Sequence, residues 1–186
     1  MSNFQKYLFW GSNAWYFAEG MLGPFFAVFA GRVGGDILDI SYAWAIFWAV
    51  TGVVAIFSGK LGDHFGKARV LFFGSVLTVI TTFGYLLVKA PIHLFIIQAL
   101  SGVAMATLNP SWYALYGEHS SRKTSGSAWG WADGSGRLFS ATAILIGGVV
   151  IKEFSFTTLF LIMGCIHTLG MLYQAQILFI QPKADQ

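Results

Sequence analysis

The sequence predicts an all-α membrane protein with six transmembrane helices and both termini on the inside. Of the 186 residues, 56% are hydrophobic and only 10% are charged, whereas a soluble domain carries about 25% charge. The apolar residues come in long runs near the ~20 residues that span a bilayer. The strand-like alternation of a transmembrane barrel is absent.

The apolar runs predict that residues 1–186 form a single domain of six helices. The helices are expected at about 7–30, 41–58, 70–88, 93–116, 127–151 and 155–180. In the first run, Gly20, Gly23 and Pro24 predict a kink. Pro110 is expected to bend the inner half of the fourth run. No internal sequence repeat is visible.

The orientation follows from the basic residues between the runs. With the N-terminus inside, seven Lys and Arg face the cytoplasm, namely Lys6, Lys60, Lys67, Arg69, Arg122, Lys123 and Lys183. Only Arg32, Lys89 and Lys152 face outward. The positive-inside rule therefore places both termini in the cytoplasm. Because the basic residues are topology signals, the pI near 9.1 does not indicate nucleic acid, and membrane lipid is the expected surroundings.

Motifs of enzymes and cofactor sites are missing. The sequence has no Gly-x-Ser-Gly, no His-Glu-x-x-His and no phosphate-binding loop. A single cysteine, Cys165, cannot form an internal disulfide, and no metal-ligand spacing is present. We therefore expect neither an enzyme nor a cofactor, and we expect Cys165, which lies in an apolar run, to be a small core residue.

A patterned segment follows the second run and reads Gly-Lys-Leu-Gly-Asp-His-Phe-Gly-Lys-Ala-Arg-Val-Leu over residues 59–71. Gly59 and Gly66 permit a tight turn and close backbone approach. Asp63 is expected to cap the next helix or to face a helix N-terminus. Lys67 and Arg69 can pair with acids or lipid phosphates.

This segment resembles the signature loop of the major facilitator superfamily, Gly-x-Leu-Ala-Asp-Arg-x-Gly-Arg-Arg/Lys, between helices two and three. The matching positions are Gly59, Leu61, Asp63 and Gly66, and Lys67 keeps the charge of an Arg position. His64 replaces an Arg and Ala68 drops a basic position. In that family the loop is a gating latch between the two halves of the transporter.

The resemblance covers one six-helix half, whereas family members usually have twelve helices. It implies a half-size secondary active transporter that works by alternating access as a homodimer, because two copies would mimic the parallel repeat of the full fold. It also implies a bacterial inner (cytoplasmic) membrane and proton-coupled efflux of small amphipathic molecules. The alternative is a non-transporting truncated half or one subunit of a hetero-complex. A channel has no charged ring or filter loop to support it.

Ionisable residues inside the runs are the first candidates for function. Glu19 in the first run and Arg137 in the fifth each lie about 18 Å along their helices, at 1.5 Å per residue. We expect them to share a water-filled cavity, with Glu19 binding and releasing the transported proton. Asp133 lies four residues before Arg137 and can pair with it on one helix face. A structural ion pair is the simpler interpretation.

Weaker candidates are neutral or small. The resemblance places Asn13, Gln98 and Asn109 on helices that line the cavity. His167 in the sixth run is expected to be a hydrogen-bonded packing residue rather than a proton carrier. Gly126, Gly130 and Gly134 form a small-residue stripe on the fifth run. The stripe packs either inside the bundle or against a partner half, and the sequence does not choose between the two.

Overall fold

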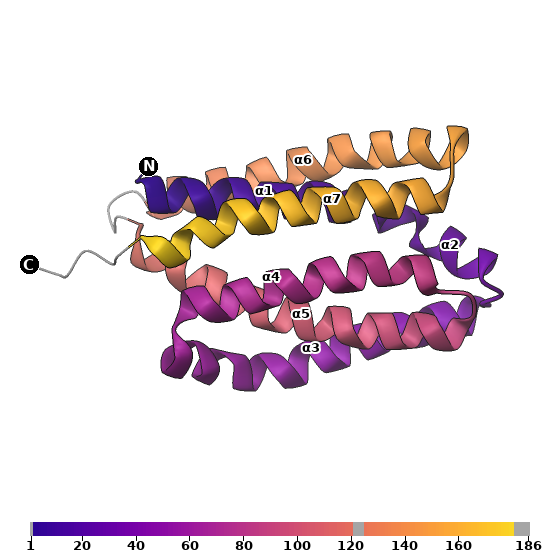
Figure 1. Cartoon of the computed structure of the whole chain (residues 1–186), viewed down its shortest axis with the longest axis horizontal. Helices are drawn as coiled ribbons and strands as arrows, with labels where there is room; N and C mark the ends of the chain where they lie inside the picture. Colours follow the sequence, from indigo (N-terminus) through magenta and orange to yellow (C-terminus); the bar gives the residue numbers. More distant parts are fainter. Residues whose placement is uncertain (1, 121–124, 181–186) are drawn as a thin grey trace, which may run out of the picture.

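A computed structural model describes residues 2–120 and 125–180 of the chain. These residues form helices without a strand, which confirms the all-α fold class (Figure 1). Three of the predicted topology residues, Arg122, Lys123 and Lys183, lie outside the described residues. The elements are α1 (Asn3–Leu22), η1 (Gly23–Phe25), α2 (Phe26–Arg32), α3 (Ile37–Phe65), α4 (Lys67–Gly84), η2 (Tyr85–Leu87), α5 (Pro91–Glu118), α6 (Ser125–Glu153), α7 (Phe156–Ala175) and η4 (Gln176–Phe179).

The first predicted helix is broken where its glycines and proline predicted a kink. α1 ends at Leu22, a 3-10 turn carries Pro24, and the chain resumes as α2 at Phe26. Pro110 removes one backbone donor but does not interrupt its helix, because α5 continues through that residue.

The connection between the second and third helices is shorter than the apolar pattern indicated. α3 continues to Phe65 and α4 begins at Lys67, so the expected loop over 59–69 is reduced to Gly66. Gly66 has a φ of 94°, a backbone conformation that favours glycine. The charged residues of the segment therefore lie on helical turns rather than in a loop.

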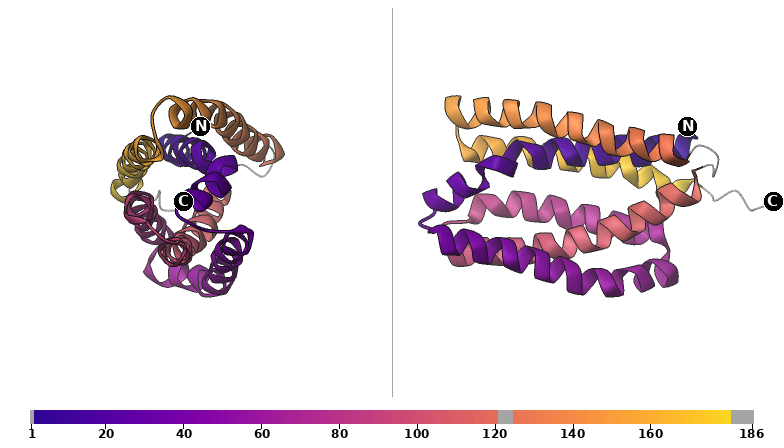
Figure 2. Two further views of the ribbon diagram at one scale, coloured as in Figure 1. Left: turned by 90° about the vertical axis from the view of Figure 1, so that its right-hand side faces the viewer. Right: turned by 180° about the vertical axis from the view of Figure 1, so that it is seen from behind.

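The helices form two groups of three, α1 with α6 and α7, and α3 with α4 and α5 (Figures 1 and 2). The α4–α7 contact joins the groups. The two groups are related if α1, α3 and α4 are taken as equivalent to α5, α6 and α7 in that order. The α3–α5 contact then corresponds to the α6–α1 contact, and the α4–α5 contact corresponds to the α7–α1 contact. This three-plus-three relation was not detectable in the sequence and is the internal symmetry found within halves of transporters.

Close helix contacts hold each group together. A Cβ built on Gly102 of α5 would lie 2.8 Å from the carbonyl oxygen of Phe47 on α3. One turn further on, the Ser58 hydroxyl donates to the carbonyl oxygen of Ala106 at 2.6 Å. Small residues and interhelical hydrogen bonds of this kind drive association in lipid, where apolar burial gives no advantage.

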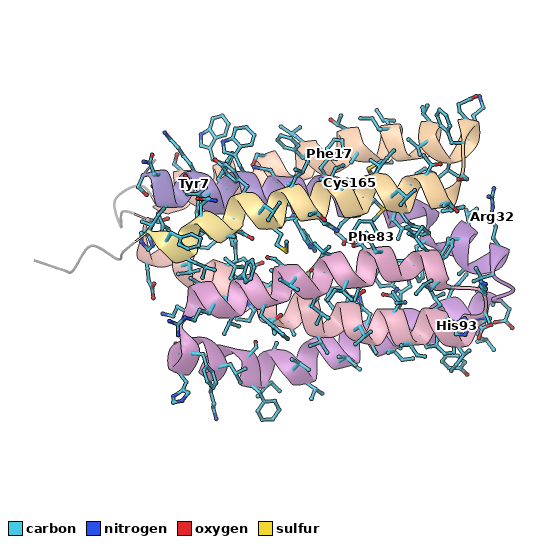
Figure 3. The ribbon with its side chains drawn as sticks, in the orientation of Figure 1. Tyr7, Phe17, Arg32, Phe83, His93 and Cys165 are labelled. Atoms are coloured by element: carbon cyan, nitrogen blue, oxygen red, sulfur yellow. The ribbon has the colours of Figure 1, made fainter. Side chains whose placement is uncertain are left out.

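Five described helices are long and apolar enough to cross a membrane, namely α3, α4 with η2, α5, α6 and α7 with η4. α1 has 20 residues but is more polar, and it lies between α6 and α7 rather than at the periphery. The start of α1, with Tyr7, and the end of α7 lie at one end of the bundle, and Arg32 and His93 lie at the other (Figures 1 and 3).

Candidate functional site

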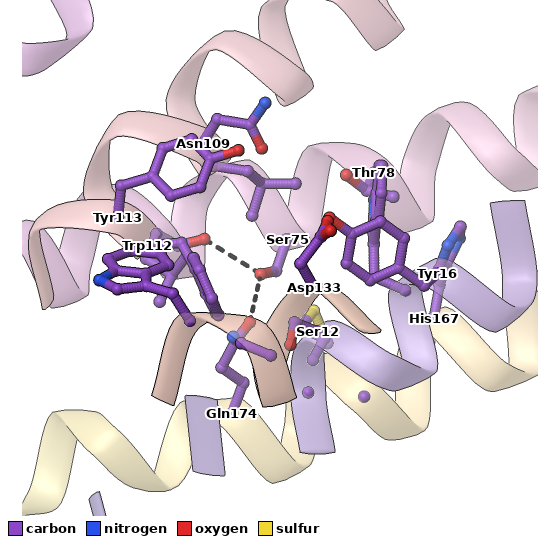
Figure 4. Close-up of a pocket in the computed structure, with 18 residues that line it drawn as sticks. Ser12, Tyr16, Ser75, Thr78, Asn109, Trp112, Tyr113, Asp133, His167 and Gln174 are labelled. Atoms are coloured by element: carbon purple, nitrogen blue, oxygen red, sulfur yellow. Dashed lines mark hydrogen bonds between the residues drawn. The ribbon is translucent and has the colours of Figure 1, made fainter. Parts of the chain in front are cut away.

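One cavity of about 220 Å³ lies in the half of the bundle near the termini, and we call it the terminal-side cavity (Figure 4). Its aromatic lining comes from Trp15, Tyr16, Trp112, Tyr113 and Trp129. Its polar lining comes from Ser12, Ser75, Thr78, Asn109, Asp133, His167 and Gln174. Ser75 donates to the Leu71 carbonyl at 3.0 Å and to Gln174 at 3.3 Å. The wall therefore combines aromatic and polar side chains, with one carboxylate among them.

A second cavity of about 280 Å³ occupies the other half, and we call it the distal cavity. Its lining includes Glu19, Gln98, Thr81, Thr82 and Tyr85, with Trp44, Phe47 and Trp48 of α3 on one side. Glu19 is its one carboxylate, and neither lining, within the part of the chain that is described, includes a Lys or Arg. The distal cavity thus holds an acid without a fixed cation.

The two cavities are arranged in series along the helix axes. On α4 the terminal-side cavity uses residues 71–78, and the distal cavity uses residues 78–82 of α4 together with Tyr85 of η2. On α5 the ranges are 108–113 and 98–105, because that helix runs the opposite way. Trp15 and Thr78 line both cavities. A path through the bundle is therefore divided near these two residues.

Glu19 lies next to this division and faces His167 of α7. The Oε1 atom of Glu19 is 3.7 Å from Nε2 of His167, which is too long for a hydrogen bond. The His167 side chain is 2% exposed, whereas that of Glu19 is 44% exposed. Nδ1 of His167 is 2.8 Å from the Thr82 hydroxyl, but Nε2 has no hydrogen-bond partner. The acid meets an imidazole with one unsatisfied nitrogen.

The expected meeting of Glu19 with Arg137 does not occur. Arg137 donates from Nε to Oδ2 of Asp133 at 2.9 Å, and these side chains are 77% and 58% exposed. Asp133 contributes to the terminal-side cavity, but Arg137 lines neither. Depth along a helix was predicted well enough, but the direction in which Arg137 points depends on how α6 packs against α1.

The neutral candidates separate into one packing residue and two lining residues. Asn13 is buried, donates to the Phe9 carbonyl at 2.9 Å and accepts from the Ser135 hydroxyl at 3.0 Å. It bridges α1 and α6 and lines neither cavity. Gln98 lines the distal cavity and Asn109 lines the terminal-side cavity.

The signature residues lie at the terminal end, where α3 meets α4. Lys67 pairs with Glu118 at the end of α5. Asp63 is exposed, and the N-cap of α4 is Gly66 without a side-chain hydrogen bond, so Asp63 does not cap α4 as expected. Gly59 lies within α3 and not in a turn. Arg69 is exposed on the first turn of α4.

The glycine stripe of α6 has no neighbour in this bundle. A Cβ on Gly126, Gly130 or Gly134 would meet nothing within 4 Å, so packing inside the described bundle does not explain the stripe. The close α1–α6 contact uses other glycines. A Cβ on Gly136 would lie 2.6 Å from the Tyr16 ring. Cys165 likewise differs from its expectation, because it is exposed on α7.

Sequence reasoning missed the importance of His167 and Thr82. Both are buried, but His167 was expected only to be a packing residue and Thr82 was not singled out. A histidine at mid-depth in a membrane helix was the signal available, since polar groups there need partners. The aromatic wall formed by Trp112, Tyr113 and Trp129 was also missed, because these residues resembled an interfacial belt.

The fold and the serial cavities define a polytopic helical membrane protein built to surround a path between its two ends. The sequence profile of the Major Facilitator Superfamily matches residues 8–186. The chain therefore belongs to this family of transporters, which are not enzymes.

Individual relatives are similar to the chain over most of its length. The multidrug resistance protein MdtG of Erwinia billingiae is 25% identical over 160 residues, covering 84% of this chain and 39% of that protein. MdtG of Dickeya zeae is 26% identical with the same coverage. MdtG of Yersinia enterocolitica is 25% identical over 174 residues, covering 91% and 42%. The chain thus spans about two fifths of the length of these relatives.

Proposed function

We propose that the chain is one half of a secondary transporter that exports small amphipathic molecules in exchange for protons by alternating access. The observation that carries the proposal is the pair of cavities in series, divided near Trp15 and Thr78, in a member of this family. Alternating access requires a site that opens to one side at a time. Both termini are proposed to be cytoplasmic, which makes the terminal-side cavity the inner one.

The proposed substrate class follows from the terminal-side cavity. Aromatic faces attract apolar and cationic groups, and Asp133 adds a carboxylate at the same wall. The relatives carry the name multidrug resistance protein, which agrees with a broad, apolar substrate range. Glu19 is proposed as the proton-binding residue, with Asp133 and Arg137 modulating access from the inside.

A second six-helix bundle is proposed to supply the opposite wall of the path. α3 and α6 are the least buried of the membrane-length helices. Only 6% and 22% of the residues in their most apolar stretches are buried inside the bundle. They are also equivalent positions in the three-plus-three relation, and α6 carries the uncovered glycine stripe. We propose a second copy of this chain as the partner, with the bundles related by an axis along the membrane normal.

Transport is tested in proteoliposomes with a panel of fluorescent lipophilic dyes, with and without a pH gradient. The expected result is dye movement that requires the protein and is faster with a gradient. Equal rates with and without the gradient would contradict proton coupling. Absence of any protein-dependent movement of every dye would favour the non-transporting alternative.

The partner is tested by cysteine cross-linking in membranes. Because Cys165 is the single cysteine, Gly130→Cys in a Cys165→Ala background reports only the stripe. We expect a covalent self-dimer on mild oxidation. Leu169→Cys in the same background is the matched control, since Leu169 is 67% exposed on α7 and should remain monomeric. Equal cross-linking at both positions, or none at Gly130→Cys, would contradict the homodimer.

A further inference from the structure

We propose that Glu19 and His167 form one proton-binding pair, in which a single proton is shared between Oε1 of Glu19 and Nε2 of His167. The inference rests on the proposed function, because it names how the proton site of the transporter is built. It gives His167 a role beyond packing, which is all that its place in an apolar run suggested.

The first argument is the vacancy at Nε2. His167 is buried, and Nε2 makes no hydrogen bond of normal geometry within the described chain, although the backbone of Trp15 lies close to the imidazole ring. Leaving a buried polar atom unsatisfied costs about 1–3 kcal/mol, and such groups in native structures are usually paired. An ionisable atom, Oε1 of Glu19, lies 3.7 Å away. A proton between these atoms would satisfy both once they approach to hydrogen-bond distance.

The second argument concerns which nitrogen is free. The Thr82 hydroxyl is 2.8 Å from the carbonyl oxygen of Thr78, to which it donates. With its proton engaged there, this hydroxyl oxygen is free to accept from Nδ1 of His167, 2.8 Å away, and on this ground we assign the tautomer with the proton on Nδ1. A neutral imidazole that donates from Nδ1 has a lone pair at Nε2. That lone pair faces Glu19, ready to accept the proton of a neutral carboxyl.

The proton balance of the pair is simple. A neutral carboxyl and a neutral imidazole hold one proton, as do a carboxylate and an imidazolium, so moving it between Oε1 and Nε2 leaves the total charge unchanged. Losing it to solvent leaves a carboxylate beside a neutral imidazole. Because the linings of the two cavities include no described Lys or Arg, no fixed cation of the described linings neutralises Glu19 there, and a bound proton would do so.

The third argument is mechanical. Glu19 lies four residues before Gly23, where α1 gives way to the 3-10 turn with Pro24. His167 lies on α7, an uninterrupted helix. A change in the bend of α1 would therefore move Oε1 toward or away from Nε2. The pair would be closed in one state and separated in another, which links proton binding to the state of the transporter.

Other titratable groups near the pair belong to four elements. Tyr85 of η2 lines the distal cavity with Glu19. His167 shares the terminal-side cavity with Tyr16 of α1, Tyr113 of α5 and Asp133 of α6. α3 contributes only apolar and indole side chains to the distal cavity. Asp133 is already paired with Arg137, so Glu19 is the carboxylate left to interact with His167.

The test is a pH titration of the protein in lipid nanodiscs with ¹⁵N-labelled histidine, followed by NMR. The chain has four histidines, and the Nε2 signal of His167 is the one missing from His167→Gln. If that variant does not fold, a triple variant of His64, His93 and His119 to Gln assigns the remaining signal. Gel filtration checks the fold of every variant.

The expected result is an Nε2 transition whose midpoint moves by about one pH unit or more in Glu19→Gln, because strongly coupled groups titrate as a pair. Glu153→Gln, the same chemical change at the exposed distal end of α6, should leave the transition unchanged. An identical transition in wild type and Glu19→Gln would overturn the pair, as would the absence of any Nε2 transition in wild type.

The outcome separates the pair from the proposed function. Dye transport that ignores the pH gradient, together with an Nε2 transition that depends on Glu19, would overturn proton-coupled transport and support the pair. Gradient-driven transport together with an Nε2 transition that is independent of Glu19 would support proton-coupled transport and overturn the pair.

Discussion

Glu19 and Asp133 are the two carboxylates of the serial cavities, and they differ in what neutralises them. Asp133 has its own cation, because Arg137 lies 2.9 Å away one helical turn along α6. Glu19 faces a buried imidazole at 3.7 Å and no described Lys or Arg in its cavity. An opposite charge close to a carboxylate favours its ionised form, whereas a carboxylate without one is more readily neutralised by a proton. The comparison therefore favours Glu19 over Asp133 as the proposed proton site.

The largest effect is expected from replacing Glu19, the carboxylate that has no described Lys or Arg in its cavity lining. Glu19→Gln should abolish the pH-gradient-driven part of dye transport and leave only the rate seen without a gradient, because the amide cannot bind the proton. Asp133→Asn is the matched change: it should lower the flux of cationic dyes, because Asp133 lines the terminal-side cavity, but keep the dependence of that flux on the gradient. The measurement is the initial dye flux with and without a gradient. Full gradient-driven flux in Glu19→Gln would break the comparison.

A smaller effect is expected from removing the hydrogen bond between Thr82 and the imidazole of His167. Thr82→Val removes the hydroxyl that bonds Nδ1 of His167 at 2.8 Å and keeps the side-chain shape. The free energy of unfolding should fall by about 1–3 kcal/mol, the cost of a buried unsatisfied polar atom. Denaturant titration in detergent micelles measures it.

Thr142→Val is the control for that substitution. The Thr142 hydroxyl also bonds a carbonyl of its own helix, that of Leu138 at 3.0 Å, but on an exposed face. Its change in unfolding free energy should stay within about 0.5 kcal/mol. Equal losses in the two variants would show that Nδ1 of His167 gains nothing from Thr82.

The smallest effect is expected from the exposed ion pair. Arg137→Gln removes the cation of Asp133, but both side chains are more than half exposed. An exposed pair at this helical spacing contributes little to stability, so the unfolding free energy in denaturant titration should stay at the wild-type value. A clear loss of stability would mean that the pair is buried against a partner bundle.

The sequence predicted the fold class well because long apolar runs have few alternatives in a bilayer. It predicted helix ends less well, since α3 and α4 continue through charged turns that hydropathy assigns to a loop. The broken first span was predictable from Pro24 because proline acts locally. Such features depend on neighbours along the chain.

The candidate site was only half predictable for a related reason. Sequence position gives the depth of Glu19 and Arg137, but the rotation of each helix about its axis is decided by packing against other helices. The stripe at Gly130 and the contact at Gly136 lie on the same helix, yet only the latter meets another helix of the bundle. His167 became visible as a partner only once α7 was placed beside α1.

Gly66 has a mechanical consequence of its own. A single residue separates α3 from α4, so the connection has no slack to absorb a shift of one helix past the other. Any tilt of α3 must pass through the two backbone torsions of Gly66 or drag the first turn of α4 with it. Lys67, the next residue, is fastened to the end of α5 through Glu118. Gly66 and the Lys67–Glu118 pair thus connect α3, α4 and α5 at the terminal end. A movement of α3 would therefore also move α4 and α5, which line the terminal-side cavity.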